Sequence, residues 1–544
     1  MALFERILTA RGLTTRAARQ AFLQPDYMAV KHDPFLLPDM KKAVARLKQA
    51  REQGEKIVIY GDYDIDGLSA TALLLDAFGK FGFEDVDAFI PNRFVEGYGM
   101  TMGAVDKVRD MGADLIVTVD TGSLCHAEIA YAASLGIDTV VTDHHNVAET
   151  PPPSVAAVNP KFPGHTYPFR DLCGAGVAFK LVQALQTELD GLPDGYEKWL
   201  LDLVALGTVC DIVTLADENR ANVYWGLEVL KKQQRPGLKA LMAVAGIEPE
   251  QVNARHLGFG LGPRMNAAGR LETAQHALDM LVARDGLAAL EASEKLEELN
   301  VKRRIIQDTI FEEACVQAEQ LADDRVLVVS SDGWNHGVIG IVASKLVEKY
   351  KKPVFIIGER GEEATGSARS FGDFSAADAV RAADDIIIKG GGHGAAAGVT
   401  LETEKIGDFR RCVNEFYDSL QLTNQERYLL PRADVEIDDF SEIDEELVAN
   451  LAKMEPFGNG NPEPVLKITR ASVLSMRRMG ADGQHVKLTL RDKNGTALQM
   501  LAFNAPEEFF CEPGDTVAAW FQPTVNEWQG VRTVEGRLLH VSEV

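Results

Sequence analysis

Three aspartates, Asp62, Asp64 and Asp66, stand at alternate positions of the stretch IVIYGDYDIDGLSATALLL and are followed at once by Gly67. Carboxylates held this close repel one another unless a cation neutralises them, so the stretch favours a metal site over a solvated acidic turn. The same spacing opens the calcium loop of an EF-hand, but that loop closes with glutamate at its twelfth position, where this chain has Leu73. We therefore expect a divalent-cation site of another kind.

Three more motifs place side chains of metal-binding type after apolar runs. LIVTVDTGS contains Asp120, LVALGTVCDIVTL contains Asp211, and TVVTDHHN contains the consecutive residues Asp143, His144 and His145. Each alone has a simpler explanation, such as a helix cap or a loop hydrogen bond, but together they favour one shared site. Oxygen ligands with imidazole and no thiolate suit manganese or magnesium better than zinc. Several carboxylates around one point predict two divalent cations, Mn²⁺ or Mg²⁺, an arrangement that cleaves phosphoesters.

The elements that must position these residues form an alternating pattern. From residue 56 to 215, short apolar segments typical of buried strands (KIVIY, VDAFI, LIVTVD, TVVTD and VAAVN) alternate for the most part with helical segments. This pattern predicts a doubly wound α/β domain with a parallel sheet. Ligands bind such sheets at the edge where the carboxyl ends of the strands meet, so we expect the distant acidic motifs to come together there.

A chain of 544 residues is too long for one hydrophobic core, and its pattern changes along its length. Residues 287–321 have the apolar spacing of one long helix, a second α/β pattern begins at RVLVVSS, and short strands with turn signals follow Pro464. The last region predicts a small barrel of OB-fold type. We expect a helical N-terminal segment, a catalytic domain, a helical region ending in the long connecting helix, a second α/β domain and the OB-like barrel, at residues 1–55, 56–215, 216–322, 323–425 and 426–544.

The composition describes a soluble globular protein, with 46% hydrophobic and 25% charged residues. No apolar run approaches the roughly 20 residues that span a bilayer, and the amphipathic N-terminus lacks a signal-peptide core. The six cysteines are scattered without a CxxC pair, which fits a reducing cytoplasm. We expect a cytoplasmic protein without a membrane partner. The formal net charge of −25 confines any nucleic-acid contact to a local patch.

At this point the motifs carry a resemblance. DYDIDG, VDTGS, TDHH and ALGTVCDIV resemble the four motifs of the DHH phosphoesterase superfamily, and GGHGAAAGV resembles the glycine-rich motif of its associated C-terminal domain. PNRFVEGYGM, GPRMNAAGR and EPFGNGNPEPVL narrow the resemblance to the RecJ family of bacterial single-stranded-DNA-specific exonucleases, over nearly the whole chain. The resemblance implies a two-metal enzyme that degrades single-stranded DNA from 5′ to 3′ and releases 5′-mononucleotides in recombination and repair.

The resemblance also implies roles for the acidic and imidazole side chains. It assigns metal ligation to Asp62, Asp64, Asp66, Asp120, His144 and Asp211. Asp120 takes the bridging position and Asp143 a supporting one, while His145 faces the scissile phosphate. One position departs from the wider superfamily, because Tyr60 stands where many members have a histidine. We infer that Asp62 or a water fills the place of that histidine.

Cations, amides and glycine-flanked residues supply the expected contacts to phosphate. The substrate-binding candidates are Arg93, Arg264, Asn266, Arg270, His336, Ser367, Arg369 and His393. Ser367 and Arg369 resemble the family's pocket for a 5′ phosphate, whereas Arg270 and His336 have equally simple structural explanations. In the barrel, Trp520, Phe521 and Trp528 either stack on bases or belong to the core. The resemblance implies single-stranded DNA, a single-strand-binding protein and a RecQ-type helicase as partners of a monomer.

Two alternative functions stay open at this stage. Small-substrate relatives, such as nanoRNases, cyclic-dinucleotide phosphodiesterases and pyrophosphatases, are shorter and lack the OB-like region and GPRMNAAGR. Non-catalytic replication scaffolds lose metal ligands, whereas every acidic motif is intact here. Because the acidic motifs lie in the first domain, we also expect that removing residues from about 465 onward leaves cleavage of very short oligonucleotides largely unaffected.

Overall fold

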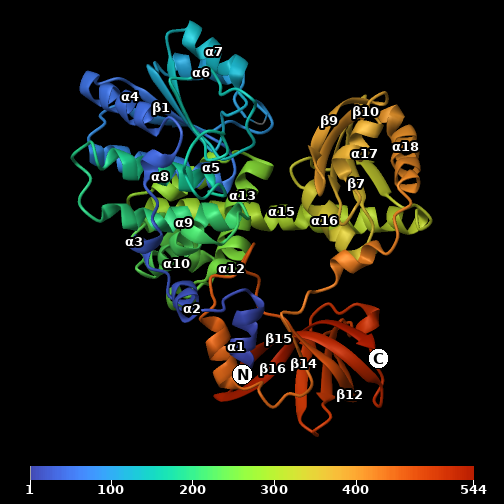
Figure 1. Cartoon of the computed structure of the whole chain (residues 1–544). Coiled ribbons are helices and arrows are strands. Elements are labelled where there is room, and N and C mark those ends of the chain that lie inside the picture. The colour runs from blue at the N-terminus through green and yellow to red at the C-terminus, as the bar shows by residue number, and fades with distance from the viewer. Residues whose placement is uncertain (1, 98) are drawn as a thin grey trace. The chain divides into compact units, whose positions relative to one another are not determined.

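The computed structural model describes residues 2–97 and 99–544 and divides into two compact units (Figure 1). The first unit comprises Met1–Gly262, Ala277–Ser293 and Pro431–Val544, and the second comprises Pro263–His276 and Glu294–Leu430. Sequence-distant segments therefore build the first unit together. The long helix α15, Gly286–Gln320, runs from the first unit into the second, which confirms the long helix predicted over residues 287–321.

The first unit contains the predicted parallel sheet. Its strands are β1 (Ile57–Gly61), β2 (Val86–Phe89), β3 (Leu115–Val119), β4 (Asp138–Thr142) and β5 (Ala156–Val158). All neighbours are parallel in the order β2-β1-β3-β4-β5, so the winding direction reverses between β1 and β3. In doubly wound sheets ligands bind at such a reversal, beside the carboxyl ends of the strands. The predicted fold class is confirmed.

Helices cover both faces of this sheet. Val58 and Tyr60 pack with residues of α6 (Met102–Asp110) and α7 (His126–Ser134) in one apolar cluster. The opposite face is covered by α5 (Ile65–Phe81) and α8 (Gly174–Leu185), and α9 (Leu201–Cys210) packs on these two helices. Further helices of the unit are α1 (Leu3–Ala10), α2 (Arg16–Leu23), α3 (Tyr27–Val30), α4 (Met40–Gln53), α10 (Asp217–Lys231), α11 (Pro236–Val244) and α12 (Ala254–His256).

The barrel also belongs to the first unit. Its strands are β12 (Leu466–Met479), β13 (His485–Arg491), β14 (Ala497–Ala502), β15 (Thr516–Trp528) and β16 (Val531–Glu543), preceded by β11 (Val435–Ile437) and α19 (Glu445–Ala452). β12 pairs with both β13 and β15, which closes the barrel as predicted. Leu3, Ile7 and Leu8 of α1 are buried in the barrel's core. The sequence did not predict this packing of the N-terminal segment.

The second unit contains a mixed sheet. Its strands are β6 (Leu327–Asp332), β7 (Val354–Arg360), β8 (Glu363–Arg369), β9 (Ile387–His393) and β10 (Ala396–Glu402), in the order β6-β7-β8-β10-β9. Only β6 and β7 pair in parallel. The helices are α13 (Gly262–Leu271), α16 (Ile339–Tyr350), α17 (Ala376–Ala382) and α18 (Ile406–Ser419), with α14 (Gln275–Val282) at the boundary. Within the described residues, no helix has the length and apolarity of a membrane span.

Candidate active site

The turn after β1 fixes the first carboxylates. Asp64 is the N-cap of α5, and its Oδ1 accepts hydrogen bonds from the backbone N–H groups of Asp66 at 2.9 Å and Gly67 at 3.2 Å. A Cβ atom added to Gly67 would lie 2.5 Å from the carbonyl oxygen of Asp62, so this tight turn requires glycine. The DYDIDG motif therefore combines a helix start with three carboxylates at the sheet edge.

Asp66 is buried and oriented by a helix from elsewhere in the chain. Its carboxylate accepts hydrogen bonds from the N–H groups of Gly174 and Ala175, the first residues of α8. These otherwise unpaired amides at the positive end of α8 suit an anion. A Cβ on Gly174 would lie 2.5 Å from the Cβ of Asp120, and one on Gly207 would lie 2.4 Å from Oδ1 of Asp66. Sequence reasoning missed both glycines, although they belong to the quoted motif ALGTV and to LCGAGVAF.

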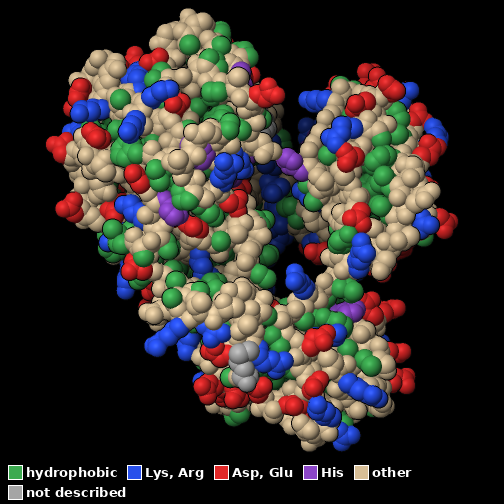
Figure 2. Space-filling view, in the orientation of Figure 1, with side chains coloured by type: hydrophobic (Ala, Val, Ile, Leu, Met, Phe, Trp, Pro, Cys, Tyr) green, Lys and Arg blue, Asp and Glu red, His purple; other side chains and the backbone are tan. Residues whose placement is uncertain are grey.

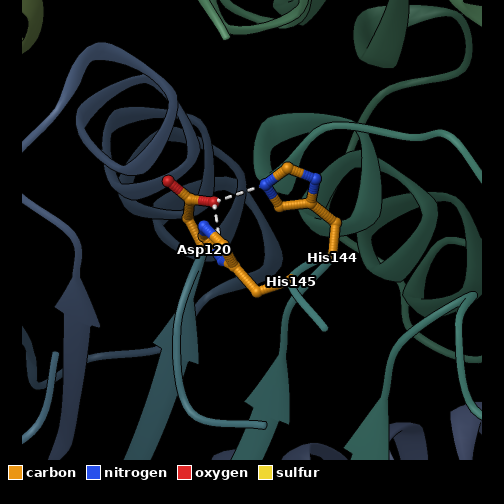
Figure 3. Close-up of side chains that lie close together, drawn as sticks. All are labelled: Asp120, His144 and His145. Carbon is orange, nitrogen blue, oxygen red and sulfur yellow. Dashed lines mark ion pairs between the residues drawn. The ribbon is translucent and has the colours of Figure 1, made fainter. Parts of the chain in front are cut away.

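Asp120 and His144 meet at the ends of β3 and β4. Asp120 has a φ of 61°, a left-handed conformation that is uncommon outside glycine and concentrates at functional sites. Its Oδ1 lies 3.0 Å from Nε2 of His144, and both point into the same space (Figure 3). Among the described residues, neither of these buried atoms has a hydrogen-bond partner. Buried polar atoms without a hydrogen-bond partner are rare, and a bound metal ion would satisfy both of these atoms as its ligands.

The neighbouring histidine is held by Asp143. The Asp143 carboxylate accepts hydrogen bonds from the N–H of Ser123 at 2.9 Å and from Nδ1 of His145 at 2.9 Å. Burial alone would raise the pKa of Asp143, but its hydrogen bonds and the charge of His145 hold that pKa well below the usual range. Burial alone would lower the pKa of His145, but Asp143 raises it to about 9. The pair is therefore an ionised carboxylate and an imidazolium at neutral pH.

The candidate ligand atoms form overlapping trios, each within 4.8 Å: Asp62 with Asp64 and Asp120, Asp66 with His144 and Asp211, and Asp120 with His144 and His145. The first two trios share no residue, which fits two ion positions. The third connects them through Asp120 and His144. The structure thus brings together every predicted ligand and His145, and the oxygen-and-imidazole donor set suits Mn²⁺ or Mg²⁺.

The electrostatics of the cluster also fit cations. Burial, followed by the charge of Asp64, raises the pKa of Asp62 to about 7 and that of Asp66 to about 6. Burial, followed by the charge of Asp66, raises the pKa of Asp120 well above its usual range and that of Asp211 to about 8. Carboxyl groups this close cannot all ionise without a positive charge between them. Divalent cations would supply that charge.

The protonation state of His144 also suits a metal ligand. Burial, reinforced by the charge of His145, lowers the pKa of His144 to about 4. Its imidazole is therefore neutral and keeps a lone pair for a metal ion.

Tyr60 and Tyr63, on either side of Asp62, have different surroundings. Tyr60 donates a hydrogen bond from its hydroxyl to the carbonyl of Gly99 at 3.0 Å and lies in the apolar cluster under α6 and α7. Tyr63 lies under the guanidinium of Arg93, 4.4 Å from ring centre to Cζ. Arg93 also contributes to the electrostatics of Asp62, so this predicted phosphate contact lies beside the acidic cluster.

In the second unit, two of the predicted phosphate-binding residues, Ser367 and Arg369, lie together. Nη1 of Arg369 donates hydrogen bonds to Oγ of Ser367 at 3.1 Å and to the carbonyl of Ala368 at 2.7 Å. A Cβ on Gly340, in the first turn of α16, would lie 3.0 Å from Oγ of Ser367 and 3.2 Å from Nη2 of Arg369. The hydroxyl, the guanidinium and the start of a helix therefore meet, and this combination can bind a phosphate group.

Other predicted phosphate contacts have protein partners. Arg270 donates from Nη1 to the carbonyl of Gly337 at 2.8 Å, just before α16, and Nε of Arg264 lies 2.5 Å from the carboxylate of Glu297. Nε2 of His336 is 3.1 Å from the carbonyl oxygen of Gly358, so this nitrogen bonds to the sheet instead of an anion. Asn266 is half-buried in α13, and His393 is exposed at the end of β9.

Three known domain families match the chain. The DHH family N-terminal domain matches residues 56–208, the DHHA1 domain matches 323–419, and the RecJ OB domain matches 433–540. Their order agrees with the two α/β sheets and the barrel.

Individual proteins are similar over most of the chain. The RecJ single-stranded-DNA-specific exonuclease of Escherichia coli is 34% identical over 92% of this chain and 89% of its own length. The Bacillus subtilis RecJ is 39% identical over 96% of this chain, which spans 65% of that protein. The crystal structure of Thermus thermophilus RecJ with Mn²⁺ matches 99% of this chain and 75% of its own at a TM-score of 0.83 and 30% identity. The chain belongs to the RecJ family of single-stranded-DNA-specific exonucleases, whose catalytic domain is of the DHH type.

Proposed function

We propose that this chain is a metal-dependent exonuclease that hydrolyses single-stranded DNA from 5′ to 3′ and releases 5′-mononucleotides in recombination and repair. The observation that carries the proposal is the meeting of two ligand trios around the buried pair Asp120 and His144. We assign catalysis to residues 56–215 and substrate contacts to the second α/β domain and the barrel. The relatives are single-stranded-DNA-specific exonucleases, which supports the proposed activity.

Six residues would hold two divalent cations, Mn²⁺ or Mg²⁺: Asp62, Asp64, Asp66, Asp120, His144 and Asp211. Such ions, when bound, supply an activated water and offset negative charge on the leaving oxygen. Asp120 shares one trio with Asp62 and Asp64 and another with His144, from which it is 3.0 Å away, so we assign it the position that would contact both ions. The backbone amides of α8 keep Asp66 oriented before any ion arrives.

His145 is the proton-bearing group of the site. Its side chain is 37% exposed, unlike that of His144 at 8%, so it can reach a substrate phosphate. Asp143 keeps it protonated, with the pKa raised to about 9 against the effect of burial. An imidazolium in this position can donate a hydrogen bond, and then a proton, to the 3′ oxygen that leaves with the released mononucleotide, while the shortened strand keeps the phosphate at its new 5′ end.

We assign recognition of the substrate's 5′ phosphate to Ser367, Arg369 and the first-turn amides of α16. A terminal phosphate carries more charge than an internal diester. A planar guanidinium can donate two parallel hydrogen bonds to its oxygens. Arg369 is half-buried with its pKa lowered by burial, so an arriving phosphate would compensate a poorly hydrated charge.

The barrel supplies affinity for a longer strand. Trp520 is partly exposed, with Nζ of Lys467 4.9 Å from its ring centre, and Trp528 is 72% exposed on a barrel hairpin. Such aromatic and cationic pairs bind bases in single strands. Phe521 is fully buried in the core, so only the core interpretation fits this residue. Lys and Arg side chains stand among acidic ones on the visible surface, as Figure 2 shows.

Further assignments rest on family membership. Single-stranded DNA is the partner we propose for the barrel, together with a single-strand-binding protein and a RecQ-type helicase that generate or present it. We propose a monomer that works in the cytoplasm, where its six free thiols would stay reduced.

Degradation of end-labelled oligonucleotides tests the function. Single strands labelled at the 5′ or the 3′ end are incubated with Mn²⁺, with Mg²⁺ and with EDTA, beside a blunt duplex as control. We expect the 5′ label to appear at once as a mononucleotide and the 3′ label to persist in shortening fragments, with no cleavage in EDTA. Early release of the 3′ label, or cleavage in EDTA, would contradict the proposal.

A further inference from the structure

The residue after Asp211 has an unusual backbone. Ile212 has a φ of 60°, which places a β-branched side chain in the left-handed region, and the side chain is 69% exposed. An isoleucine in this conformation is an outlier that persists only when its surroundings hold it. Since Ile212 is exposed, packing of its own side chain does not hold it. The constraint must come from its backbone.

A loop from the barrel side of the chain provides that constraint. Nδ2 of Asn459 donates a hydrogen bond to the carbonyl of Ile212 at 2.8 Å, and the N–H of Leu215 donates to the carbonyl of Asn459 at 2.8 Å. Asn459 therefore bonds to both ends of the segment 212–215, which follows Asp211. It lies 247 positions after Ile212 in the sequence. Asn459 belongs to the motif EPFGNGNP, which the mechanism above does not use.

The loop at residues 455–461 is itself fixed against the catalytic core. The buried guanidinium of Arg220 donates hydrogen bonds to the carbonyls of Met454, Glu455 and Pro456 at 2.9–3.2 Å. Gly460 has a φ of 76°, and a Cβ added to it would lie 2.5 Å from Cγ2 of Thr214, so this position beside the segment after Asp211 favours glycine. The glycines of the motif permit the approach, and Asn459 makes the polar contact.

We propose that Asn459 is a positioning residue for the metal-site carboxylate Asp211. It holds the strained peptide that follows Asp211, and thereby the direction in which this carboxylate joins Asp66 and His144. The proposal rests on the proposed role of Asp211 as a ligand. The loop that contains Asn459 lies between α19 and the first barrel strand β12. The geometry of the metal site therefore depends on a segment that is far from the catalytic motifs in the sequence.

The test uses the full-length Asn459→Ala variant and measures Mn²⁺ affinity, from the electron paramagnetic resonance signal of free Mn²⁺, beside kcat and KM on a short oligonucleotide. Loss of a residue that orients a metal ligand lowers metal affinity or activity by about 10–100-fold. We expect Mn²⁺ affinity and kcat to fall about tenfold at unchanged KM. Asn459→Asp, which removes the donor, should behave likewise, and the surface variant Asn450→Ala should match wild type.

A second substitution separates positioning from simple docking of the barrel. Glycine adopts the left-handed conformation without strain, so Ile212→Gly should restore most of the Mn²⁺ affinity to Asn459→Ala. Wild-type Mn²⁺ affinity in Asn459→Ala would overturn the proposal, as would a loss that Ile212→Gly does not restore. A wild type that binds Mn²⁺ but does not cleave DNA would refute the proposed function, while the loss and rescue of Mn²⁺ affinity would still support positioning.

Discussion

The acidic cluster of the first unit and the phosphate-binding residues of the second are built on opposite principles. Asp66 and Asp120 are 1% exposed and are held by backbone amides or by a strained backbone. Ser367 and Arg369 are half-exposed, and the glycine-rich strand β9 is exposed at the edge of its sheet. Chemistry on a phosphodiester needs charges fixed in advance in a dry site, whereas recognition of a phosphate needs accessible donors.

The two sheets explain how each principle is met. In the parallel sheet, all strands end at one edge, so Asp62, Asp120 and Asp143 follow β1, β3 and β4 and are buried under helices. In the mixed sheet, neighbouring strands mostly run in opposite directions, and residues on β8 meet a helix start at Gly340 instead of other strand ends. The difference predicts that substitutions in the two regions have different kinetic signatures.

The largest effect is expected from Asp120→Ala, in the acidic cluster. Loss of the carboxylate between the two trios should reduce hydrolysis of every substrate by at least about a thousandfold, because a preorganised charge in a water-excluded site is removed. Turnover of single strands with either 5′ end is the measurement, with Asp110→Ala, an exposed acidic residue of the same domain, as the control. A purified, folded Asp120→Ala enzyme with a tenth of wild-type activity would show that the site is misassigned.

Arg369→Ala should instead affect one kind of substrate. Wild type is expected to cleave 5′-phosphorylated strands faster than 5′-hydroxyl strands, and the variant should lose most of that preference. A charge-assisted hydrogen bond contributes about 1.5–3 kcal/mol, which corresponds to about tenfold to a hundredfold.

The measurement is kcat/KM for both ends, with the exposed Arg381→Ala as the matched control. The same preference in wild type and Arg369→Ala would mean that these residues do not read the 5′ phosphate.

The buried carboxyls predict a pH-dependent stability of the metal-free protein. Burial, followed by the charges of neighbouring carboxylates, raises the pKa of Asp62 to about 7 and that of Asp211 to about 8. A carboxyl with a raised folded pKa stabilises the fold below its ordinary value, and this contribution is lost as the pH rises through the folded value. In EDTA, Tm should therefore fall between about pH 4 and pH 8.

Mn²⁺ should oppose this loss, because it replaces the protons as the compensating charge. The increase in Tm on adding Mn²⁺ should therefore grow from pH 5.5 to pH 8, as measured by differential scanning calorimetry. An increase that is independent of pH would argue that the ion binds elsewhere.

The smallest effect is expected at the barrel. Trp528→Ala should weaken binding of a long single strand about fivefold, since stacking on one exposed ring contributes roughly 1 kcal/mol. Val531→Ala, at the paired position of the same hairpin, removes exposed apolar surface without a ring and is the control. Fluorescence anisotropy in EDTA measures both. Equal weakening by the two variants would exclude stacking at Trp528.

The strand-end carboxylates could be predicted because local patterns encode them: an apolar run marks each strand, and the next residues lie at its carboxyl end. Long-range packing leaves no such pattern. α1 joins the barrel core across more than four hundred residues, with the N–H of Leu3 bonded to Glu442. The role of Asn459 and the need for Gly174 and Gly207 depend equally on partners far away in the sequence.

These contacts also change one expectation drawn from the sequence. The barrel core includes α1, and the loop before β12 holds the peptide after Asp211. Removing residues from about 465 onward would expose that core, so we no longer expect cleavage of short oligonucleotides to be unaffected. His336 shows the same limit, because only the fold reveals that its Nε2 is used by the carbonyl of Gly358.

The central claim is that the two trios bind two ions as one site. Crystals of the full chain grown with Mn²⁺ test it through anomalous scattering at the manganese edge. We predict two peaks, one among Asp62, Asp64 and Asp120 and one among Asp66, His144 and Asp211, separated by roughly 3.5–4 Å as in other two-metal sites. No peak within reach of Asp120, or a single ion bound away from both trios, would contradict the account.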